Sequence, residues 1–247
     1  MDIRSSKKRL DVLLFEKGLV PSRRRAGALI MAGKVTVDGV RIDKPGKEVS
    51  SVAALSLKEG IPYVSRGGIK LEAALDAFKL DPKGLVLLDA GASTGGFTHC
   101  LLQRGARKVI CLDVGYGQLD WRIRTDERVT VMERTNIRYV DAGSLPGHVD
   151  AAVADLSFIS LKLVFQKFSE IIPEKGWLVP LVKPQFEAGR EHVGKGGVVR
   201  DESKILEAVE KARTAAENCG FLVLAQIESP VRGPKGNREF FLHLQRA

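Results

Sequence analysis

The 247-residue chain has little cysteine, few aromatic residues and no long hydrophobic run. Its three cysteines are an odd number without metal-type spacing, which predicts neither a disulfide framework nor a metal site and fits the reducing cytoplasm. No apolar run approaches the ~20 residues that a membrane-spanning helix needs. The first nine residues are followed by no apolar signal core, so we predict a cytoplasmic protein without a secretion signal.

Positive charge is in excess and gathers at the N-terminal end. The chain has 39 Lys and Arg against 30 Asp and Glu, a net charge of +9. Residues 1–60 hold 13 of the basic and 7 of the acidic side chains, so a quarter of the chain carries two-thirds of the excess. Such a local excess favours a polyanionic partner, most often nucleic acid, although a plain basic surface is the alternative.

The first 60 residues predict a small α+β module. Leucines at helical spacing predict a helix from about residue 10, and Ser22 is the expected N-cap of a second helix that ends at Gly33. Asp38-Gly39 lies between two alternating stretches, which is typical of a hairpin turn. A short strand is expected near residues 54–57.

The rest of the chain, residues 65–247 after a predicted linker at 61–64, alternates strands and helices. Strands are expected at 85–89, 109–113, 129–132, 151–155, 178–182, 221–227 and 239–244. Helices are expected at 68–78, 96–103, 161–171 and 203–218. This alternation predicts an α/β fold with a mostly parallel sheet covered on both faces, and an antiparallel pair at the end.

Residues 87–98 have the pattern of a strand, a glycine-rich turn and a helix. Gly91, Gly95 and Gly96 permit tight turning and close approach of a ligand. Asp113 ends the next strand, where a carboxylate can accept hydrogen bonds from ribose hydroxyls. Ser93 replaces the middle glycine of the dinucleotide fingerprint, so a cofactor without pyrophosphate, S-adenosylmethionine, is favoured. A dinucleotide site and a purely structural turn are the alternatives.

Four polar residues stand in unusual places. Lys70 is expected in the first turn of a helix, where the helix dipole disfavours a cation. Asp155 and Lys183 end two strands, and Glu239 opens the last one after a turn-rich segment. Taken alone, each of these four residues is most simply interpreted as a charged side chain at the solvated surface. Strand tips at one edge of a parallel sheet converge, however, so Asp155 and Lys183 should face the same cleft as Gly91.

In this order the four residues resemble the Lys-Asp-Lys-Glu tetrad of FtsJ-type ribose 2′-O-methyltransferases. The surrounding segments 65–71, 89–98, 154–160 and 181–187 resemble the TlyA, or hemolysin-A-like, rRNA methyltransferases. The N-terminal module is similar to the S-four RNA-binding domain. The resemblance implies 2′-O-methylation of cytidine in the rRNA of one or both subunits. It also implies a Rossmann-like methyltransferase fold whose seven-stranded, mostly parallel sheet has one reversed strand.

On this basis we assign roles to the tetrad. A lysine that is buried near another cation can be neutral near pH 7, so Lys183 is the predicted base. Lys70 would orient the hydroxyl and favour the developing oxyanion, while Asp155 and Glu239 would hold the lysines. Asp89 would meet the methionine ammonium group directly or through water. The predicted cofactor-binding residues are Asp89, Gly91, Ala92, Ser93, Thr94, Gly95, Gly96, Phe97, Asp113, Asn136 and Asp155.

The expected partner is ribosomal RNA or a ribosomal subunit. Arg23, Arg24 and Arg25 are the strongest candidates for phosphate contacts because they begin a helix, whose free N–H groups also suit phosphate. The full predicted RNA-binding set is Arg4, Lys7, Arg9, Arg23, Arg24, Arg25, Lys34, Arg41 and Arg66. The glycine-rich stretch 184–200 is predicted to be a lid or substrate loop. Two other functions are considered: a non-catalytic RNA-binding factor and a membrane-active hemolysin, for which the composition offers no spanning segment.

Overall fold

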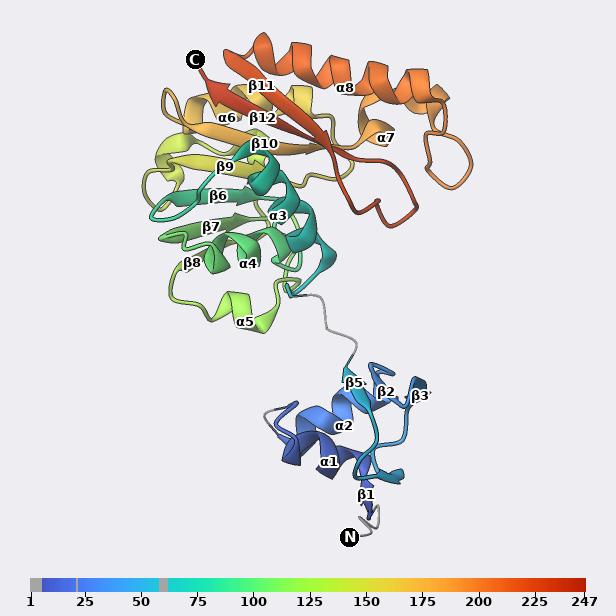
Figure 1. Ribbon diagram of the computed structural model, residues 1–247. Helices are drawn as coiled ribbons and strands as arrows, with labels where there is room; N and C mark the ends of the chain where they lie inside the picture. Colours follow the sequence, from blue (N-terminus) through green and yellow to red (C-terminus); the bar gives the residue numbers. More distant parts are fainter. Residues whose placement is uncertain (1–5, 21, 58–61) are drawn as a thin grey trace. The chain divides into compact units, whose positions relative to one another are not determined.

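The computed structural model describes residues 6–20, 22–57 and 62–247. The chain divides into two compact units, Met1–Pro62 and Tyr63–Ala247 (Figure 1). The linker expected at 61–64 falls at this division. Residue 61 lies outside the described residues, whereas Tyr63 is buried in the core of the second unit and Val64 packs against that core.

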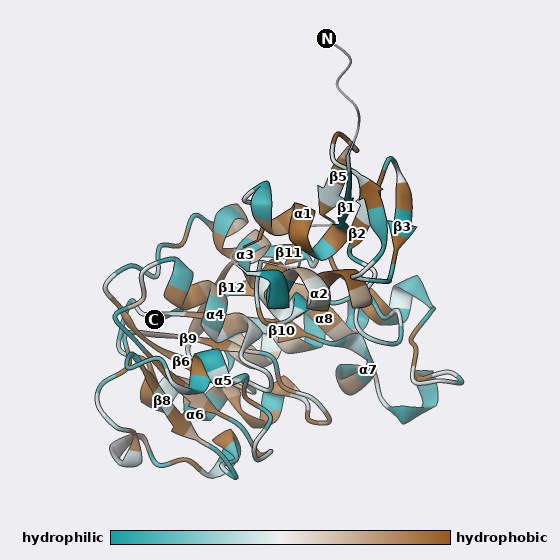
Figure 2. Ribbon diagram, turned by 90° about the horizontal axis from the view of Figure 1, so that it is seen from below, coloured by the Kyte–Doolittle hydropathy of each residue, from teal (hydrophilic) through white to brown (hydrophobic). Residues whose placement is uncertain are grey.

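The first unit places two helices against short strands. Its elements are β1 (Lys7–Arg9), α1 (Leu10–Glu16), α2 (Arg23–Met31), β2 (Val35–Val37), β3 (Val40–Ile42), β4 (Glu48–Ser50) and β5 (Leu55–Leu57). Ser22 Oγ accepts a hydrogen bond from Arg25 N, which confirms the predicted N-cap. Asp38 and Gly39 both have positive φ, as a two-residue hairpin turn requires. Figure 2 shows the hydrophobic ribbon of α1 and β2 in brown.

The second unit is built from one large sheet and its flanking helices. The chain order begins with α3 (Arg66–Phe78), β6 (Val86–Ala90), α4 (Gly96–Gln103), β7 (Lys108–Leu112), α5 (Trp121–Arg124), β8 (Val129–Met132) and β9 (Ala151–Ala154). It continues with α6 (Phe165–Ile171), β10 (Trp177–Val182), α7 (Pro184–Glu187), α8 (Glu202–Glu217), β11 (Phe221–Glu228) and β12 (Phe240–Arg246). Short 3-10 helices lie at Ile137–Tyr139, Ala142–Ser144, Leu161–Leu163 and Arg190–His192.

The sheet has seven strands in the order β11-β12-β10-β9-β6-β7-β8. β12 runs antiparallel to both of its neighbours, and the other pairs are parallel. The predicted α/β methyltransferase fold with one reversed strand is therefore confirmed. From β6 the chain continues to β7 and β8 on one side, and it then crosses to β9 on the other side of β6. The carboxyl end of β6 is thus a switch point, where open sheets bind ligands.

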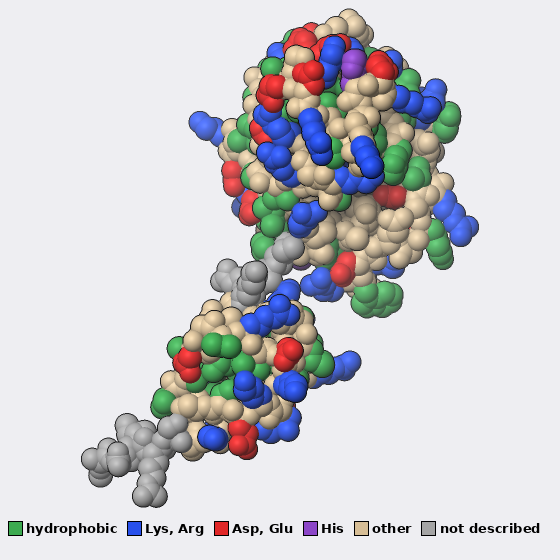
Figure 3. All heavy atoms as spheres, turned by 90° about the vertical axis from the view of Figure 1, so that its right-hand side faces the viewer, with side chains coloured by type: hydrophobic (Ala, Val, Ile, Leu, Met, Phe, Trp, Pro, Cys, Tyr) green, Lys and Arg blue, Asp and Glu red, His purple; other side chains and the backbone are tan. Residues whose placement is uncertain are grey.

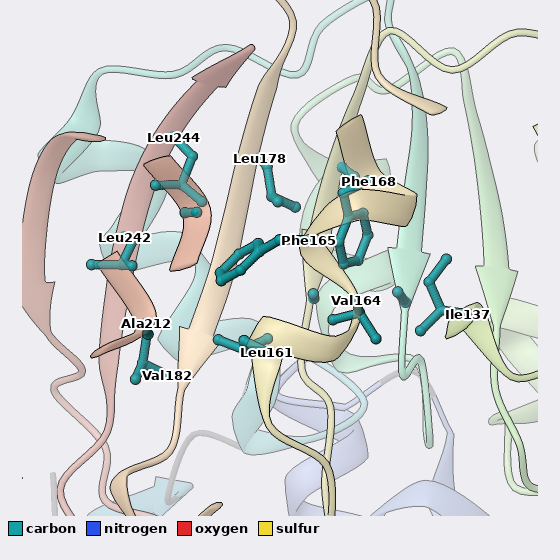
Figure 4. Packing of buried hydrophobic residues seen from close by; sticks show 14 of the residues in the cluster. Ile137, Leu161, Val164, Phe165, Phe168, Leu178, Val182, Ala212, Leu242 and Leu244 are labelled. Carbon is teal, nitrogen blue, oxygen red and sulfur yellow. The ribbon is translucent and has the colours of Figure 1, made fainter. Parts of the chain in front are cut away.

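Hydrophobic side chains cover both faces of this sheet. One face packs against α6 and α8, and Figure 4 shows Phe165 and Phe168 of α6 near Leu178 of β10. The other face packs against α3 and α4 through Leu71, Leu101 and their neighbours. Because both faces are buried, the central strands contain continuous apolar runs instead of alternating ones.

Two local predictions differ from the structure. The single helix expected at 161–171 is divided into a 3-10 turn and α6, because Val164 leaves helical geometry. The helix α3 begins earlier than predicted, because the side chain of Ser65 caps it and Arg66 is its first residue. Lys70 is therefore the fifth residue of the helix and lies beyond its first turn. The dipole effect fades beyond the first turn, so it does not explain this lysine.

Candidate active site

The glycine turn after β6 passes close to the end of β9. Gly91 has φ +85°, and a Cβ placed there would lie 2.6 Å from the carbonyl oxygen of Asp155. At Gly96 a Cβ would lie 2.2 Å from Ser65 Oγ, so only glycine lets α4 begin against the cap of α3. These two glycines bring the turn, Asp155 and the helix that carries Lys70 to one place.

A cleft of about 700 Å³ opens beside this turn. Five of the predicted cofactor-binding residues line it, namely Gly91, Ser93, Asp113, Asn136 and Asp155. Ala92, Thr94, Gly96 and Phe97 line an adjoining cleft of about 180 Å³, together with Lys70 and Arg66. The structure therefore gathers most of the predicted set around one edge of the sheet.

Asp113 shapes the wall of the larger cleft. Its two carboxylate oxygens accept hydrogen bonds from Ser93 N and Gly115 N, each at 2.7 Å. The carboxylate thereby ties the glycine turn to the loop after β7. Each oxygen retains a second lone pair, which leaves capacity for the hydroxyl groups of a bound ribose.

Asp89 lies inside the protein instead of at the wall of a cleft. Its side chain is fully buried, and Oδ2 accepts a hydrogen bond from Thr98 Oγ1 at 2.6 Å. Oδ1 has no hydrogen-bond partner among the described residues. Burial raises the pKa of Asp89 to about 7. The structure thus gives no direct contact surface for the role that we expected of Asp89 toward a methionine ammonium group.

From the burial of Asp89 we predict that the stability of the fold decreases as the pH rises. Its pKa is about 7 when folded, against an ordinary 3.8, so ionisation is disfavoured in the folded state. This group therefore removes stability as the pH rises from about 4 to about 7, on the order of 4 kcal/mol in total. We expect Asp89→Asn to lose less stability than the unsubstituted protein between pH 5 and pH 8, measured by urea unfolding. Equal losses in both proteins would contradict this.

The four tetrad residues form two ion pairs. Lys70 Nζ donates to Glu239 Oε2 at 2.5 Å, and these side chains are 8% and 1% exposed. Lys183 Nζ lies 2.6 Å from Asp155 Oδ1 and donates to Ser157 Oγ at 2.8 Å. Each lysine is thus held by a carboxylate from a distant part of the chain.

The side chains of the two ion pairs line two neighbouring cavities. Lys70 and Asp155 line the cleft of about 180 Å³, whereas Lys183 and Glu239 line a cavity of about 260 Å³. Each space therefore receives a lysine from one pair and a carboxylate from the other. Two lysine side chains beside the cofactor cleft can act on a hydroxyl group in two ways. A charged ammonium group can orient the hydroxyl group and stabilise developing negative charge, whereas a neutral amine can accept its proton.

Three residues of this region were not predicted as functional: Ser157, Phe158 and Gln185. Phe158 is 92% exposed at φ +64°, and its ring centroid lies 5.3 Å from that of Phe186. It lines both the cofactor cleft and the cavity beside Lys183. No periodicity distinguishes these residues in the sequence. Their signals in the sequence were proximity to Asp155 and Lys183 and a place in the segments 154–160 and 181–187, which carry the family resemblance.

The glycine-rich stretch expected to be a lid is anchored at its far end. Asn237 is 3% exposed, donates to Gly197 O at 2.8 Å and accepts from Val199 N at 3.1 Å. A bridge joins Gly194 to Val198 within the stretch. These contacts attach it to the loop before β12, two residues from Glu239.

Four of the predicted RNA-binding residues of the first unit form two pairs with different surroundings. Arg9 and Arg23 form ion pairs with Asp11, which lower the pKa of this almost buried carboxyl. Arg24 and Arg25 are exposed, and no carboxylate pairs with them in the described part of the chain. Figure 3 shows Lys and Arg side chains on the surface of this unit.

The remaining predicted cations have different surroundings. Lys7 and Arg66 are exposed, Lys34 is half-buried, and Arg41 is exposed with its guanidinium against Gly33. Arg4 lies outside the described residues. Across the described ranges no three His, Cys, Asp or Glu side chains form a metal-type cluster. None of the described helices has the length and apolar character needed to cross a membrane.

Comparison with known proteins agrees with this architecture. The model of the FtsJ-like methyltransferase family matches residues 63–246, and that of the S4 domain matches residues 8–51. The 16S/23S rRNA (cytidine-2′-O)-methyltransferase TlyA of Mycobacterium tuberculosis is 46% identical over 239 residues, covering 96% of this chain and 89% of that protein. Hemolysin A of Brachyspira hyodysenteriae is 38% identical over 237 residues, covering 95% and 98%. A solved structure of a hemolysin candidate from Streptococcus thermophilus has a TM-score of 0.75 and 44% identity, covering 98% and 89%.

Proposed function

The chain belongs to the FtsJ-like methyltransferase family, and we propose that it transfers a methyl group from S-adenosylmethionine to a ribose 2′-hydroxyl group of cytidine in ribosomal RNA. The observation that carries the proposal is the pair of carboxylate-held lysines beside the cofactor cleft. The named activity of the mycobacterial relative supports the choice of rRNA and cytidine.

The residues around the cleft suit S-adenosylmethionine. Asp113 offers a carboxylate at the end of β7 for the ribose hydroxyls, and Asn136 adds a polar side chain on the same wall. When bound, this cofactor would supply a methyl group on a sulfonium centre, with the neutral thioether as the leaving group. The task of the protein is to bring the hydroxyl group into line and to remove its proton.

Lys183 is the proposed base. A neutral amine has two N–H bonds and one lone pair. Ser157 Oγ accepts one of those bonds at 2.8 Å, and Asp155 Oδ1, which lies 2.6 Å from Nζ, holds the amine as its ion-pair partner. The lone pair is then left for the substrate hydroxyl group in the adjacent cavity. With the cofactor bound, Lys183 Nζ would accept the hydroxyl proton as the oxygen attacks the methyl group. Lys70, held by Glu239, stabilises the negative charge that develops on the oxygen.

Both units offer surfaces that suit RNA. Exposed Arg24 and Arg25 at the start of α2 suit phosphate groups, which position a protein without reading sequence. In the second unit the Arg134 guanidinium lies 4.3 Å from the ring centroid of Tyr116, which is 68% exposed. Arginine and aromatic side chains together bind unstacked RNA bases.

The proposal predicts methyl transfer from labelled S-adenosylmethionine to ribosomal particles. We expect a single class of product, 2′-O-methylcytidine, in nuclease digests analysed by mass spectrometry. Small subunits, large subunits and protein-free rRNA are tested separately, because the target subunit is part of the proposal. Labelling of a base instead of ribose would overturn the assignment. Salt-dependent binding without any methyl transfer would favour the non-catalytic RNA-binding function.

A further inference from the structure

The cavity of about 260 Å³ beside Lys183 adjoins the cofactor cleft, with which it shares Ser157 and Phe158 as lining residues. Phe158 and Phe186 provide aromatic surface in it, and Gln185 and Asn237 provide carboxamide groups. It is smaller than the roughly 300–1,000 Å³ of pockets that enclose drug-sized ligands. Its size and its aromatic walls suit a single planar ring.

The two carboxamides differ in how their hydrogen bonds are used. Asn237 is committed to the backbone, since it binds Gly197 O and Val199 N. The Gln185 carboxamide oxygen is buried, and no group among the described residues donates to it. A buried polar atom without a partner costs free energy, so natural proteins keep few of them. Gln185 therefore brings to this cavity an acceptor that no described group uses.

The position of Gln185 relates it to the reacting hydroxyl group. It is two residues after Lys183 and lies in α7, a short helix that begins with Pro184. A ribose placed at the Lys183 amine carries its own base on the neighbouring carbon of the ring. The base of the nucleotide being methylated is thus directed to a space within reach of Lys183, and this cavity is lined by Lys183 itself.

We propose that Gln185 binds the hydrogen-bonding edge of the target base and determines which base is accepted. A carboxamide presents an acceptor next to a donor. This pattern is complementary to the amino group and the adjacent ring nitrogen of cytosine. The inference rests on the proposed ribose methylation and adds to it the residue that selects the nucleotide.

The test compares Gln185→Leu with the unsubstituted protein. Leucine has a similar size but neither donates nor accepts. On ribosomal particles we expect kcat/KM to fall by about 10- to 100-fold, the value of one good contact to a base edge. Affinity for S-adenosylmethionine, measured by calorimetry, should be unchanged. The matched control is Gln166→Leu, because Gln166 is an exposed glutamine on α6, outside the site.

Base selectivity separates this role from a merely structural one. Once mass spectrometry has located the target cytidine, particles with uridine at that position are compared with the original ones. We expect the preference for cytidine to shrink toward unity in Gln185→Leu. A lower rate with an unchanged preference, or a rate like that of the unsubstituted protein, would overturn the inference while leaving the methyltransferase function intact. If the unsubstituted protein transfers no methyl group, the proposed function itself fails and this inference with it.

Discussion

Lys183→Ala is expected to lower methyl transfer by roughly 10²–10⁴-fold, the usual contribution of a general base. The cofactor cleft is formed by the glycine turn and the loops after β7, β8 and β9, and Lys183 does not line it, so the affinity for S-adenosylmethionine should change little. The fold should also persist, because the released carboxylate of Asp155 is 25% exposed and can be hydrated. Single-turnover rates and calorimetric titration measure the two effects separately.

Two further variants sharpen this prediction. Lys183→Arg keeps the positive charge but cannot release its proton near neutral pH, so it should be as inactive as the alanine variant if proton removal is the essential step. Lys167→Ala serves as the control because Lys167, on α6, pairs with Glu170 at the surface. A Lys183→Arg variant with nearly full activity would show that charge, not proton transfer, is what this position supplies.

Much of the fold was predictable because it depends on local patterns. The apolar strands, the glycine turn and the caps are specified by neighbouring residues, and the structure has them within a few positions. Some very short elements were not predicted, although the equally short β2 and β3 were, because the Asp38-Gly39 turn marks them. β1, β4, α5 and α7 have three or four residues each, too few to show a hydrophobic period.

The site was only partly predictable, because side-chain direction is a tertiary property. Position along a strand suggested that Asp89 would meet the cofactor, yet the side chain is buried against Thr98. The cross-pairing of Lys70 with Glu239 joins residues 169 positions apart, which no local pattern specifies. The exposure of Phe158 and the unpaired oxygen of Gln185 likewise arise from how loops after different strands meet.

Glu239→Ala is expected to destabilise the second unit by about 3–5 kcal/mol, because it leaves the Lys70 ammonium group buried without its partner. Unfolding in urea is followed by tryptophan fluorescence. Both tryptophans of the chain, Trp121 and Trp177, belong to the second unit, so the signal does not mix the two units. Exposed Glu170→Ala, which also removes the partner of a lysine, should cost less than about 1 kcal/mol.

A double substitution distinguishes what the pair does for stability from what it does for function. In Lys70→Met with Glu239→Met, two unbranched apolar side chains replace the buried ions, and such replacements are often neutral or stabilising. Stability should therefore return to near that of the unsubstituted protein, while methyl transfer stays lost because the ammonium group beside the reacting oxygen is gone. A buried ion pair that adds little net stability, yet cannot be replaced without loss of turnover, is present for its charge. If the double variant regained activity along with stability, Lys70 would be a packing residue, and Lys183 would remain as the only candidate for the chemistry.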